Sequence, residues 1–318
     1  MRKFNTKYPI MYLLEASEVV KRYANHLALD NLDVQIPQNE IFGLLGPNGA
    51  GKTTFIRIIN HITMPDKGSI LFNGRPLKSE DIYNIGYLPE ERGLYKKMKV
   101  GEQALYLARL KGMSKNDAYK KLKYWFEKFE IGAWWDKKVE ELSKGMQQKV
   151  QFIVTVLHEP KLLIFDEPFS GFDPINANLL KREILELKEN GATIIFSTHN
   201  MSSVEELCDN ICLINKSKSI LKGKVDEVKQ TFKNNEVMID FAGEKALFEE
   251  KLNGDYQLKS LNENHGGYLA KIKMNMGDDT NQLISKLLPD FKIRGFQEIL
   301  PTMDEVFIKA VEQSNTKQ

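Results

Sequence analysis

A glycine-rich run that ends in a lysine and two threonines is the segment best suited to chemistry. It has the sequence GPNGAGKTT over residues 46–54 and follows the apolar stretch Ile41–Gly46. Backbone N–H groups approach phosphate oxygens closely where side chains are absent, and the helix expected next adds positive potential at its N-terminus. The run therefore predicts the phosphate-binding loop of a nucleotide-binding protein.

Individual positions of this loop have separate expected roles. Lys52 is expected to stabilise the β- and γ-phosphates during reaction, Thr53 to give its hydroxyl to Mg²⁺, and Thr54 to add a phosphate contact. The other expected phosphate-binding positions are Gly46, Pro47, Asn48, Gly49, Ala50 and Gly51. The alternative is an accidental match to the motif.

A second apolar stretch ends in two adjacent carboxylates. Residues 161–167 have the sequence KLLIFDE, and a strand in a parallel sheet delivers its terminal side chains to the carboxyl edge of that sheet. Asp166 is expected to hold Mg²⁺ through water. Glu167 faces differently because side chains alternate along a strand, so we predict that it is the general base for the attacking water. The alternative is an acidic pair on the surface.

The sequence LSKGMQQ at residues 142–148 lies between these two motifs. With them it resembles the ATP-binding subunits of ABC transporters, whose signature has the sequence LSGGQ. The resemblance implies that Ser143 and the amide of Gly145 contact the γ-phosphate of ATP, whereas Lys144 and Met146 depart from the pattern. Lys144 either reinforces the positive end of the following helix or points to solvent.

Three further positions match the family one by one. Tyr23 corresponds to the aromatic residue that stacks on adenine, with a core tyrosine as the alternative. Asp173 lies in the sequence SGFDP and corresponds to the residue that couples two nucleotide sites, with an ordinary turn as the alternative. His199 follows an apolar strand and corresponds to the histidine that contacts the γ-phosphate and positions water. A structural histidine is the alternative there.

A second departure from the family lies at Glu90, within the sequence IGYLPEERGLY at residues 85–95. The family usually carries a glutamine at this position. A carboxylate still accepts hydrogen bonds from water or binds Mg²⁺, and it adds negative charge near a triphosphate. The sequence PEERGLY at residues 89–95 resembles the corresponding segment in a branch of exporter-type ATPases.

The elements that position these residues predict an α/β fold, a P-loop NTPase of ABC type with a parallel-sheet core. We expect an N-terminal extension at residues 1–10 and the ATP-binding domain at 11–232. An antiparallel β region is expected near Leu27–Ile36 and Ser69–Phe72, and a helical subdomain at about 96–159 carries the signature.

After residue 235 the sequence changes to short alternating strands and two helical patterns. The expected segments are Val237–Phe241, Lys245–Leu252, Tyr256–Leu261, Tyr268–Met274, Thr280–Leu288 and Phe291–Ile299. The order strand, helix, strand, strand, helix, strand predicts a small ferredoxin-like α+β domain over 236–312, finished by a helix at Met303–Val311. It carries no catalytic group of residues, and regulation, dimer support and stability are all open roles.

Composition limits the class of protein. The 318 residues are 42% hydrophobic, enough for about two domains with substantial cores. A net charge of +2 gives no electrostatic case for nucleic acid, and the two cysteines, Cys208 and Cys212, are expected to be reduced packing residues. No apolar stretch approaches the roughly 20 residues that span a bilayer, and the opening residues do not resemble a signal peptide.

The resemblance implies an ATPase that works as a dimer, with Mg-ATP between Lys52 of one copy and Ser143 of another. We expect two such sites, a homodimer and an integral-membrane permease as partner, and no nucleic acid partner. The chain is expected to be cytoplasmic and peripheral on the inner face of the membrane, as the energy-coupling subunit of an exporter. Alternatives are an importer subunit or a soluble ABC-family ATPase acting on ribosomes, nucleic acid or protein complexes. Lipids, drugs, peptides and ions all remain open as substrates.

Overall fold

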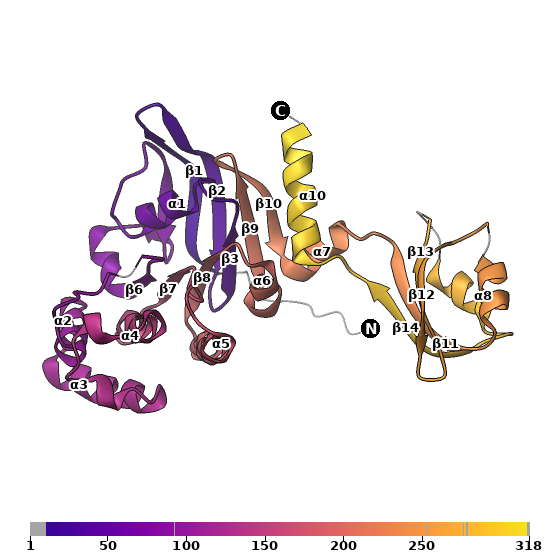
Figure 1. Cartoon of the computed structure of the whole chain (residues 1–318). Helices are drawn as coiled ribbons and strands as arrows, with labels where there is room; N and C mark the ends of the chain where they lie inside the picture. The colour runs from indigo at the N-terminus through magenta and orange to yellow at the C-terminus, as the bar shows by residue number, and fades with distance from the viewer. Residues whose placement is uncertain (1–10, 92, 253, 276, 278, 317–318) are drawn as a thin grey trace. The chain divides into compact units, whose positions relative to one another are not determined.

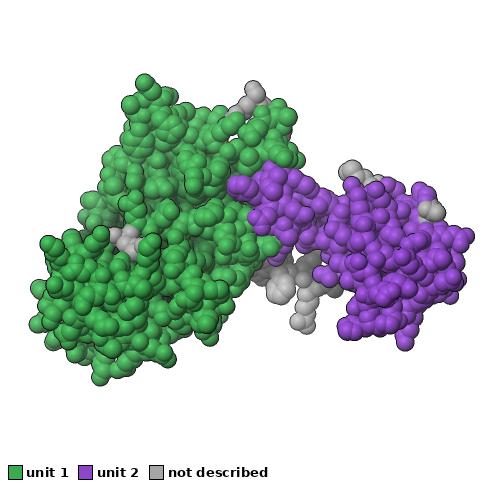
Figure 2. All heavy atoms as spheres, in the orientation of Figure 1, with its two compact units in different colours: residues 1–225, 310–318 green, residues 226–309 purple. Residues whose placement is uncertain are grey.

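The structure is a computed structural model that describes residues 11–91, 93–252, 254–275, 277 and 279–316 (Figure 1). The expected extension at residues 1–10 lies outside these residues. The chain divides into two compact units, coloured separately in Figure 2. Unit 1 consists of residues 1–225 and 310–318, and unit 2 consists of residues 226–309.

A six-stranded sheet forms the centre of unit 1, with the strand order β10-β9-β3-β8-β7-β6. Its strands are β3 (Ile41–Leu45), β6 (Ile85–Leu88), β7 (Leu162–Asp166), β8 (Thr193–Thr198), β9 (Asn210–Asn215) and β10 (Lys218–Lys224). All pairs are parallel except that of β9 with β10. Every residue of β3, β7 and β8 is buried, which explains the apolar run that each strand contains. The predicted parallel-sheet core is confirmed.

The carboxyl ends of these strands meet at one edge of the sheet. In the register of the ladders, Leu45 of β3 faces Thr198 of β8, and Asp166 of β7 faces Ser197 of β8. The glycine-rich run follows β3 and leads into α1 (Lys52–Ile59). The two motifs of the sequence are therefore delivered to the same edge.

A four-stranded antiparallel sheet packs against apolar residues of α1. Its order is β2-β1-β4-β5, with β1 (Tyr12–Tyr23), β2 (His26–Pro37), β4 (Lys67–Phe72) and β5 (Arg75–Pro76). One buried apolar cluster joins Leu14 and Leu29 of this sheet with Phe55 of α1 and Leu44 of β3. The predicted antiparallel region is confirmed, and its core fixes α1 against the parallel sheet.

The segment between β6 and β7 is helical, as expected. Its α-helices are α2 (Val100–Leu110), α3 (Lys115–Lys128) and α4 (Lys144–Val156), and its 3₁₀ turns are η2 (Gly132–Trp134) and η3 (Val139–Glu141), with η1 (Ser79–Asn84) ahead of β6. Trp125 packs edge-on against Phe152 of α4, whose ring lies 5.6 Å from that of Phe165 in β7. Aromatic packing thus joins the helical segment to the central sheet.

Two more helices complete the part of unit 1 that precedes β9, namely α5 (Pro174–Glu189) and α6 (Met201–Leu207). Cys208 and Cys212 lie directly after α6 and within β9, and both are free and buried. Burial raises the pKa of both thiols, that of Cys212 to about 11. No helix of the described residues is long and apolar enough to cross a membrane.

Unit 2 contains an antiparallel sheet of order β12-β13-β11-β14. Its elements are β11 (Glu236–Ala242), α8 (Lys245–Leu252), β12 (Gln257–Asn264), β13 (Gly267–Lys273), α9 (Thr280–Leu287) and β14 (Lys292–Ile299), preceded by α7 (Val225–Thr231). Val237, Ile239 and Phe241 alternate along β11 and share one core with Phe248 of α8 and Leu283 of α9. The predicted ferredoxin-like order and its α+β class are confirmed.

The last helix, α10 (Met303–Thr316), runs beyond the predicted end at Val311. Its final turns, from Ala310 onward, belong to unit 1. There the hydroxyl of Ser314 accepts a hydrogen bond from the Asn215 side chain at 3.4 Å. The extra length therefore has a partner at the end of β9.

The close contact between Gly101 and Trp135 generates a test of the helical segment. A methyl group at Gly101 would lie 2.2 Å from a ring carbon of Trp135, whose ring also contacts Tyr119 and Phe126. We expect Gly101→Ala to lower the free energy of unfolding by about 1–3 kcal/mol in chemical denaturation. Gly132→Ala is the matched control because nothing lies within 4 Å of the added atom. Equal stability of the two variants would contradict this packing.

Candidate nucleotide-binding site

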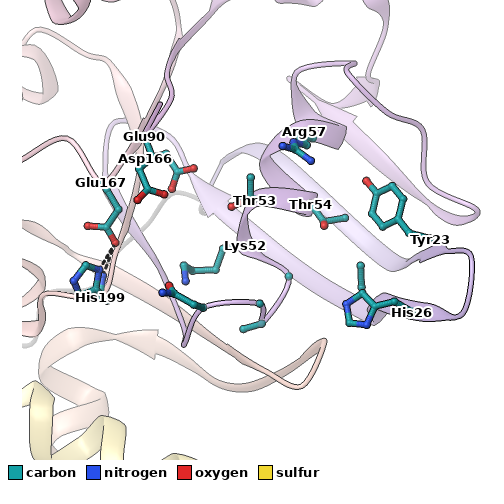
Figure 3. A pocket seen from close by; sticks show the side chains of 15 residues that line it. Tyr23, His26, Lys52, Thr53, Thr54, Arg57, Glu90, Asp166, Glu167 and His199 are labelled. Carbon is teal, nitrogen blue, oxygen red and sulfur yellow. Dashed lines mark hydrogen bonds and ion pairs between the residues drawn. The ribbon is translucent and has the colours of Figure 1, made fainter. Parts of the chain in front are cut away.

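The pocket at the carboxyl edge of the parallel sheet gathers most of the predicted site residues (Figure 3). Its volume is about 330 Å³. The predicted residues that line it are Tyr23, Asn48, Gly49, Ala50, Gly51, Lys52, Thr53, Thr54, Glu90, Asp166, Glu167 and His199. They come from the ends of β1 and β7, the glycine-rich run, α1 and the segments that follow β6, β7 and β8. Folding therefore brings together side chains that are far apart in the sequence.

The glycines of the loop are required by close backbone approaches. Gly46 and Gly51 have positive φ angles of 148° and 119°. A Cβ atom would lie 2.2 Å from the carbonyl oxygen of Ile214 at Gly46, and 2.5 Å from that of Ala28 at Gly51. No residue with a side chain fits either position without a backbone shift. Glycine at these two positions thus lets the loop pack directly against the backbone at Ile214 and Ala28.

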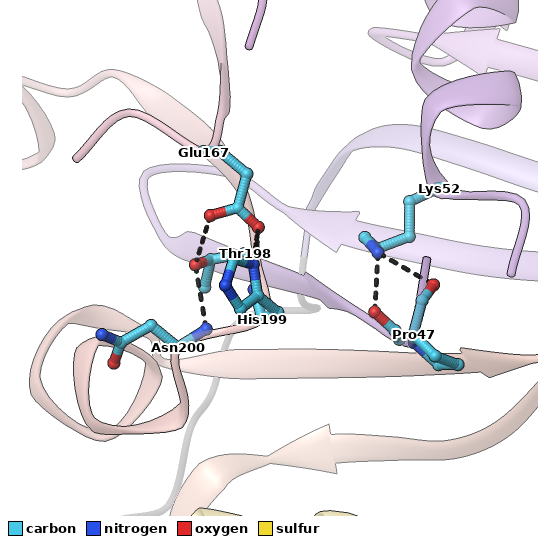
Figure 4. A network of polar contacts seen from close by, with 7 residues as sticks. Pro47, Lys52, Glu167, Thr198, His199 and Asn200 are labelled. Atoms are coloured by element: carbon cyan, nitrogen blue, oxygen red, sulfur yellow. Dashed lines mark hydrogen bonds and ion pairs between the residues drawn. The ribbon is translucent and has the colours of Figure 1, made fainter. Parts of the chain in front are cut away.

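Lys52 is buried beneath this loop, with only 8% of its surface exposed. Its ammonium group donates to the carbonyl oxygens of Gly46 at 2.6 Å and Pro47 at 3.2 Å, although neither of these residues lines the pocket (Figure 4). Burial lowers the pKa of Lys52, and the negative charges of Glu167 and Asp166 oppose that shift. The lysine is therefore a positive charge fixed at the floor of the pocket.

Glu167 is held by a network of three hydrogen bonds (Figure 4). The hydroxyl of Thr198 donates to one carboxylate oxygen at 3.1 Å, and the backbone N–H of His199 donates to the other at 2.9 Å. The Nδ1 atom of His199 lies 2.6 Å from that second oxygen. Glu167 also has a φ of +48°, a left-handed conformation that costs about 1 kcal/mol or more. The carboxylate is therefore oriented by its neighbours.

Asp166 lies one residue earlier and is 4% exposed. Burial raises the pKa of its carboxyl group, the charges of Glu167 and Glu90 add to the shift, and the charge of Lys52 opposes it. Thr53, Asp166 and Glu90 bring oxygen donors to one pocket, which are the ligands that Mg²⁺ prefers. The described residues contain no group of three or more histidine, cysteine or carboxylate side chains that would hold a metal alone.

Tyr23 ends β1 at the rim of the pocket and is 39% exposed. The Nζ atom of Lys21 lies 5.5 Å from its ring centroid. The alternative of a buried core tyrosine is therefore wrong. An aromatic ring accessible at a nucleotide-sized pocket is suited to stacking on a base.

Three residues of the pocket are absent from the sequence-based expectations: His26, Ala28 and Arg57. His26 opens β2 and faces Tyr23 across the turn between β1 and β2. Arg57 lies four residues after Thr53 on α1, so the helical period places both on one face. The helical period was the available signal for Arg57, whereas no local pattern distinguishes His26.

The predicted residues of the signature and of the SGFDP segment do not line this pocket. Ser143 caps the N-terminus of α4, where its hydroxyl accepts from the backbone N–H of Met146 at 3.3 Å. Gly145 lies beside Phe172, with an added Cβ in ordinary contact at 3.6 Å. Asp173 caps α5 by accepting from two backbone N–H groups at 3.0 Å. These residues therefore form a second set, outside the pocket of their own chain.

A phosphate-binding loop ahead of α1, a buried strand that ends in two carboxylates and a helical insertion between them define an ATP-binding cassette. Residues 29–170 match the family described as ABC transporter. Residues 223–311 match the C-terminal domain of ATP-binding proteins like DrrA1-3. The chain belongs to the ATP-binding proteins of ABC transporters, a family that hydrolyses ATP to power transport.

Individual relatives support this assignment over most of the chain. An uncharacterized ABC transporter ATP-binding protein of Bacillus subtilis, YhaQ, is 44% identical over 94% of this chain and 98% of its own length. The lantibiotic transport ATP-binding protein SrtF of Streptococcus pyogenes is 33% identical over 72% of this chain and 99% of its own. A solved ATP-binding subunit of an ABC transporter superposes with a TM-score of 0.65 at 31% identity, covering 69% of this chain and 93% of that one.

The position of Glu167 generates a test of the site. Glu167→Gln keeps the shape of the side chain but removes its ability to accept a proton from water. We expect ATP turnover by the purified protein to fall by about 100-fold or more, with ATP binding retained. Glu91→Gln is the matched control, because Glu91 is exposed and does not line the pocket. Normal turnover by Glu167→Gln would exclude Glu167 as the base.

Proposed function

We propose that this chain is the ATP-hydrolysing subunit of an exporter, and that it binds two Mg-ATP at the interface of a homodimer. The observation that carries the proposal is the single pocket in which buried Lys52 lies with Asp166 and Glu167 at one sheet edge. A further relative, the Nod factor export ATP-binding protein I of Cupriavidus metallidurans, is 32% identical over 68% of this chain and 72% of its own. Its name favours export over import.

In the proposed reaction, water attacks the γ-phosphate in line with the departing ADP oxygen. Lys52 and the amides of the glycine-rich loop bind the phosphates, and Glu167 accepts the proton of the attacking water. Thr53, Asp166 and Glu90 would hold Mg²⁺, which neutralises charge on the phosphate oxygens when it is bound. Tyr23 would stack on the adenine base. His199, bonded to Glu167, keeps that carboxylate oriented and is 74% exposed, so it is free to meet the γ-phosphate.

The homodimer is supported by where the second set of residues lies. Ser143 and Gly145 form the N-terminal turn of α4, a helix of 13 residues whose first N–H groups suit an anion. They do not reach the pocket of their own chain. A second copy, bound with its α4 facing the γ-phosphate, would complete each site, and Asp173 would then lie at the interface between the two sites.

The permease, we propose, binds a groove of about 440 Å³ in unit 1. Apolar side chains dominate its lining, including Leu94, Leu107 and Leu110. Among the lining residues, Ile62 is 61% exposed and Leu110 is 55% exposed. Large apolar side chains gathered at an exposed groove mark an interaction surface. Binding at this surface would place the chain in the cytoplasm, on the inner face of the membrane.

The groove and the nucleotide pocket share one short segment of chain. Pro89 lines the groove, and its neighbour Glu90 lines the nucleotide pocket. Tyr87 of β6, two residues earlier, also lines the groove. A displacement of this segment would therefore change the shape of both the nucleotide pocket and the groove. This supports Glu90 as the residue that links nucleotide state to the permease.

Co-purification from native membranes tests the permease. Tagged Glu167→Gln protein, held in Mg-ATP and gently extracted, is expected to carry a stoichiometric multi-span protein detectable by mass spectrometry. The added substitution Leu110→Asp should remove that protein, because it places a charge in the apolar groove. Lys115→Glu, on the exposed surface outside the groove, is the control. Enrichment of ribosomal proteins or nucleic acid in place of a multi-span protein would favour the soluble-ATPase alternative.

The direction of transport is tested separately in cells that lack this gene. Small molecules and peptides are compared by mass spectrometry in cells and medium, with a Glu167→Gln copy as an inactive control. An exporter predicts a compound that rises inside the cells and falls in the medium in both strains. The opposite distribution would establish an importer.

A further inference from the structure

The floor of the proposed permease groove contains a half-buried lysine. Lys111 follows the last residue of α2 and lines the groove. Its ammonium group donates to the carbonyl oxygens of Ile82 at 2.7 Å and Ile85 at 2.8 Å. These two bonds hold the charge at a fixed place beneath the apolar walls, and they use two of its three N–H donors.

The charge of Lys111 has no counter-charge within the groove. No aspartate or glutamate occurs among the described residues that line it, and none of the described carboxylates forms an ion pair with Lys111. Burial alone lowers the pKa of Lys111. His158 lines the same groove, and its own pKa is lowered to about 4 by burial and by the charge of Lys111. The histidine is therefore neutral at pH 7, and Lys111 is the only formal charge among the described lining residues.

Two further polar side chains that line the groove have atoms without a hydrogen-bond partner among the described residues. Gln151 is 4% exposed and lines the groove, and its amide oxygen has no hydrogen-bond partner among the described residues. Its amide nitrogen already lies 3.5 Å from the carbonyl oxygen of Glu91. Both ring nitrogens of His158 likewise have no hydrogen-bond partner among the described residues. The lining thus presents the third N–H of Lys111, the acceptor of Gln151 and the imidazole of His158 among apolar side chains.

Covering this groove with a purely apolar segment would be unfavourable. Water at the third N–H of Lys111 would be removed and nothing would replace it, and an uncompensated buried charge is strongly destabilising. A carboxylate in the covering segment removes that cost, because the two charges neutralise each other where the lysine is already oriented. Charge complementarity therefore selects the chemistry of the occupant.

We propose that the permease segment in this groove is apolar and carries one aspartate or glutamate whose carboxylate pairs with Lys111. The proposal rests on the proposed function, since it takes the permease as the occupant of the groove. A backbone or side-chain donor of the same segment would satisfy Gln151. This pairing sets the register of the segment in the groove, because the apolar walls alone do not distinguish one position along it from the next.

Zero-length cross-linking tests the pairing without any substitution at Lys111. The complex of tagged Glu167→Gln with its multi-span partner is treated with a carbodiimide, which activates carboxylates so that a contacting amine forms an amide with them. Peptide mass spectrometry is expected to find Lys111 joined to an aspartate or glutamate of the partner. Cross-links from other lysines of unit 1 to the partner, with none from Lys111, would overturn the proposal.

Substitutions give an independent measurement on the same complex. Lys111→Met removes the charge and keeps an apolar stem, so we expect the yield of the multi-span protein to fall about tenfold or more. Lys111→Glu should lower it further through repulsion, whereas Lys111→Arg should retain most of it. Lys115→Glu is the control for a charge change outside the groove. Thermal unfolding of each variant reports whether loss of the bonds to Ile82 and Ile85 affects folding.

The outcomes separate this proposal from the proposed function. Loss of the partner in Leu110→Asp, with normal yield in both Lys111→Met and Lys111→Glu, would overturn the carboxylate while leaving the permease in the groove. Normal yield in Leu110→Asp would overturn the permease groove itself, and the pairing with it. Loss in folded Lys111→Met together with retention in Lys111→Arg would support the pairing.

Discussion

Complete burial of β3, β7 and β8 is the constraint on which the catalytic unit depends. Strands with no exposed face must be covered on both sides. Helices supply part of this cover, and the antiparallel sheet shares one buried core with α1 and β3. Their parallel ladders then fix the ends of three strands relative to one another. The loop carrying Lys52, the pair Asp166 and Glu167, and the segment carrying His199 all begin where these strands stop. The geometry of the site is thus a result of strand register.

The same constraint explains how much could be predicted from sequence. Apolar runs that end in glycine or in carboxylates identify buried parallel strands, so the places of the glycine-rich loop and of Glu167 at the end of such strands were predictable from local patterns. The alternating strands of unit 2 gave its element order equally well, with errors confined to ends such as that of α10. Features that depend on packing between distant segments were not predictable. His26 reaches the pocket because β2 pairs with β1. Lys111 is held in the groove because its ammonium group bonds to the carbonyl oxygens of Ile82 and Ile85, about 26 to 29 residues earlier in the chain.

Two departures from the family pattern, Glu90 and Lys144, lie in different parts of unit 1. Glu90 enters a pocket that already contains Asp166 and Glu167, so three carboxylates face the buried charge of Lys52. Lys144 opens α4 beside Ser143, where a positive side chain adds to the positive end of the helix. One substitution therefore makes the nucleotide pocket more acidic, and the other makes the surface proposed to meet a second copy more basic. The two changes are of opposite sign on the two faces that the proposed homodimer would bring together.

The two cysteines have a practical consequence for following this cycle in solution. Both thiols are buried, and with the pKa of Cys212 at about 11 and that of Cys208 raised further, thiolate is scarce at neutral pH. Thiol reagents act on the thiolate, so the native residues should stay silent towards maleimide dyes and nitroxide spin labels. A single cysteine introduced on the exposed surface would then carry the only probe. Distances between labelled copies could therefore be measured without first replacing Cys208 and Cys212.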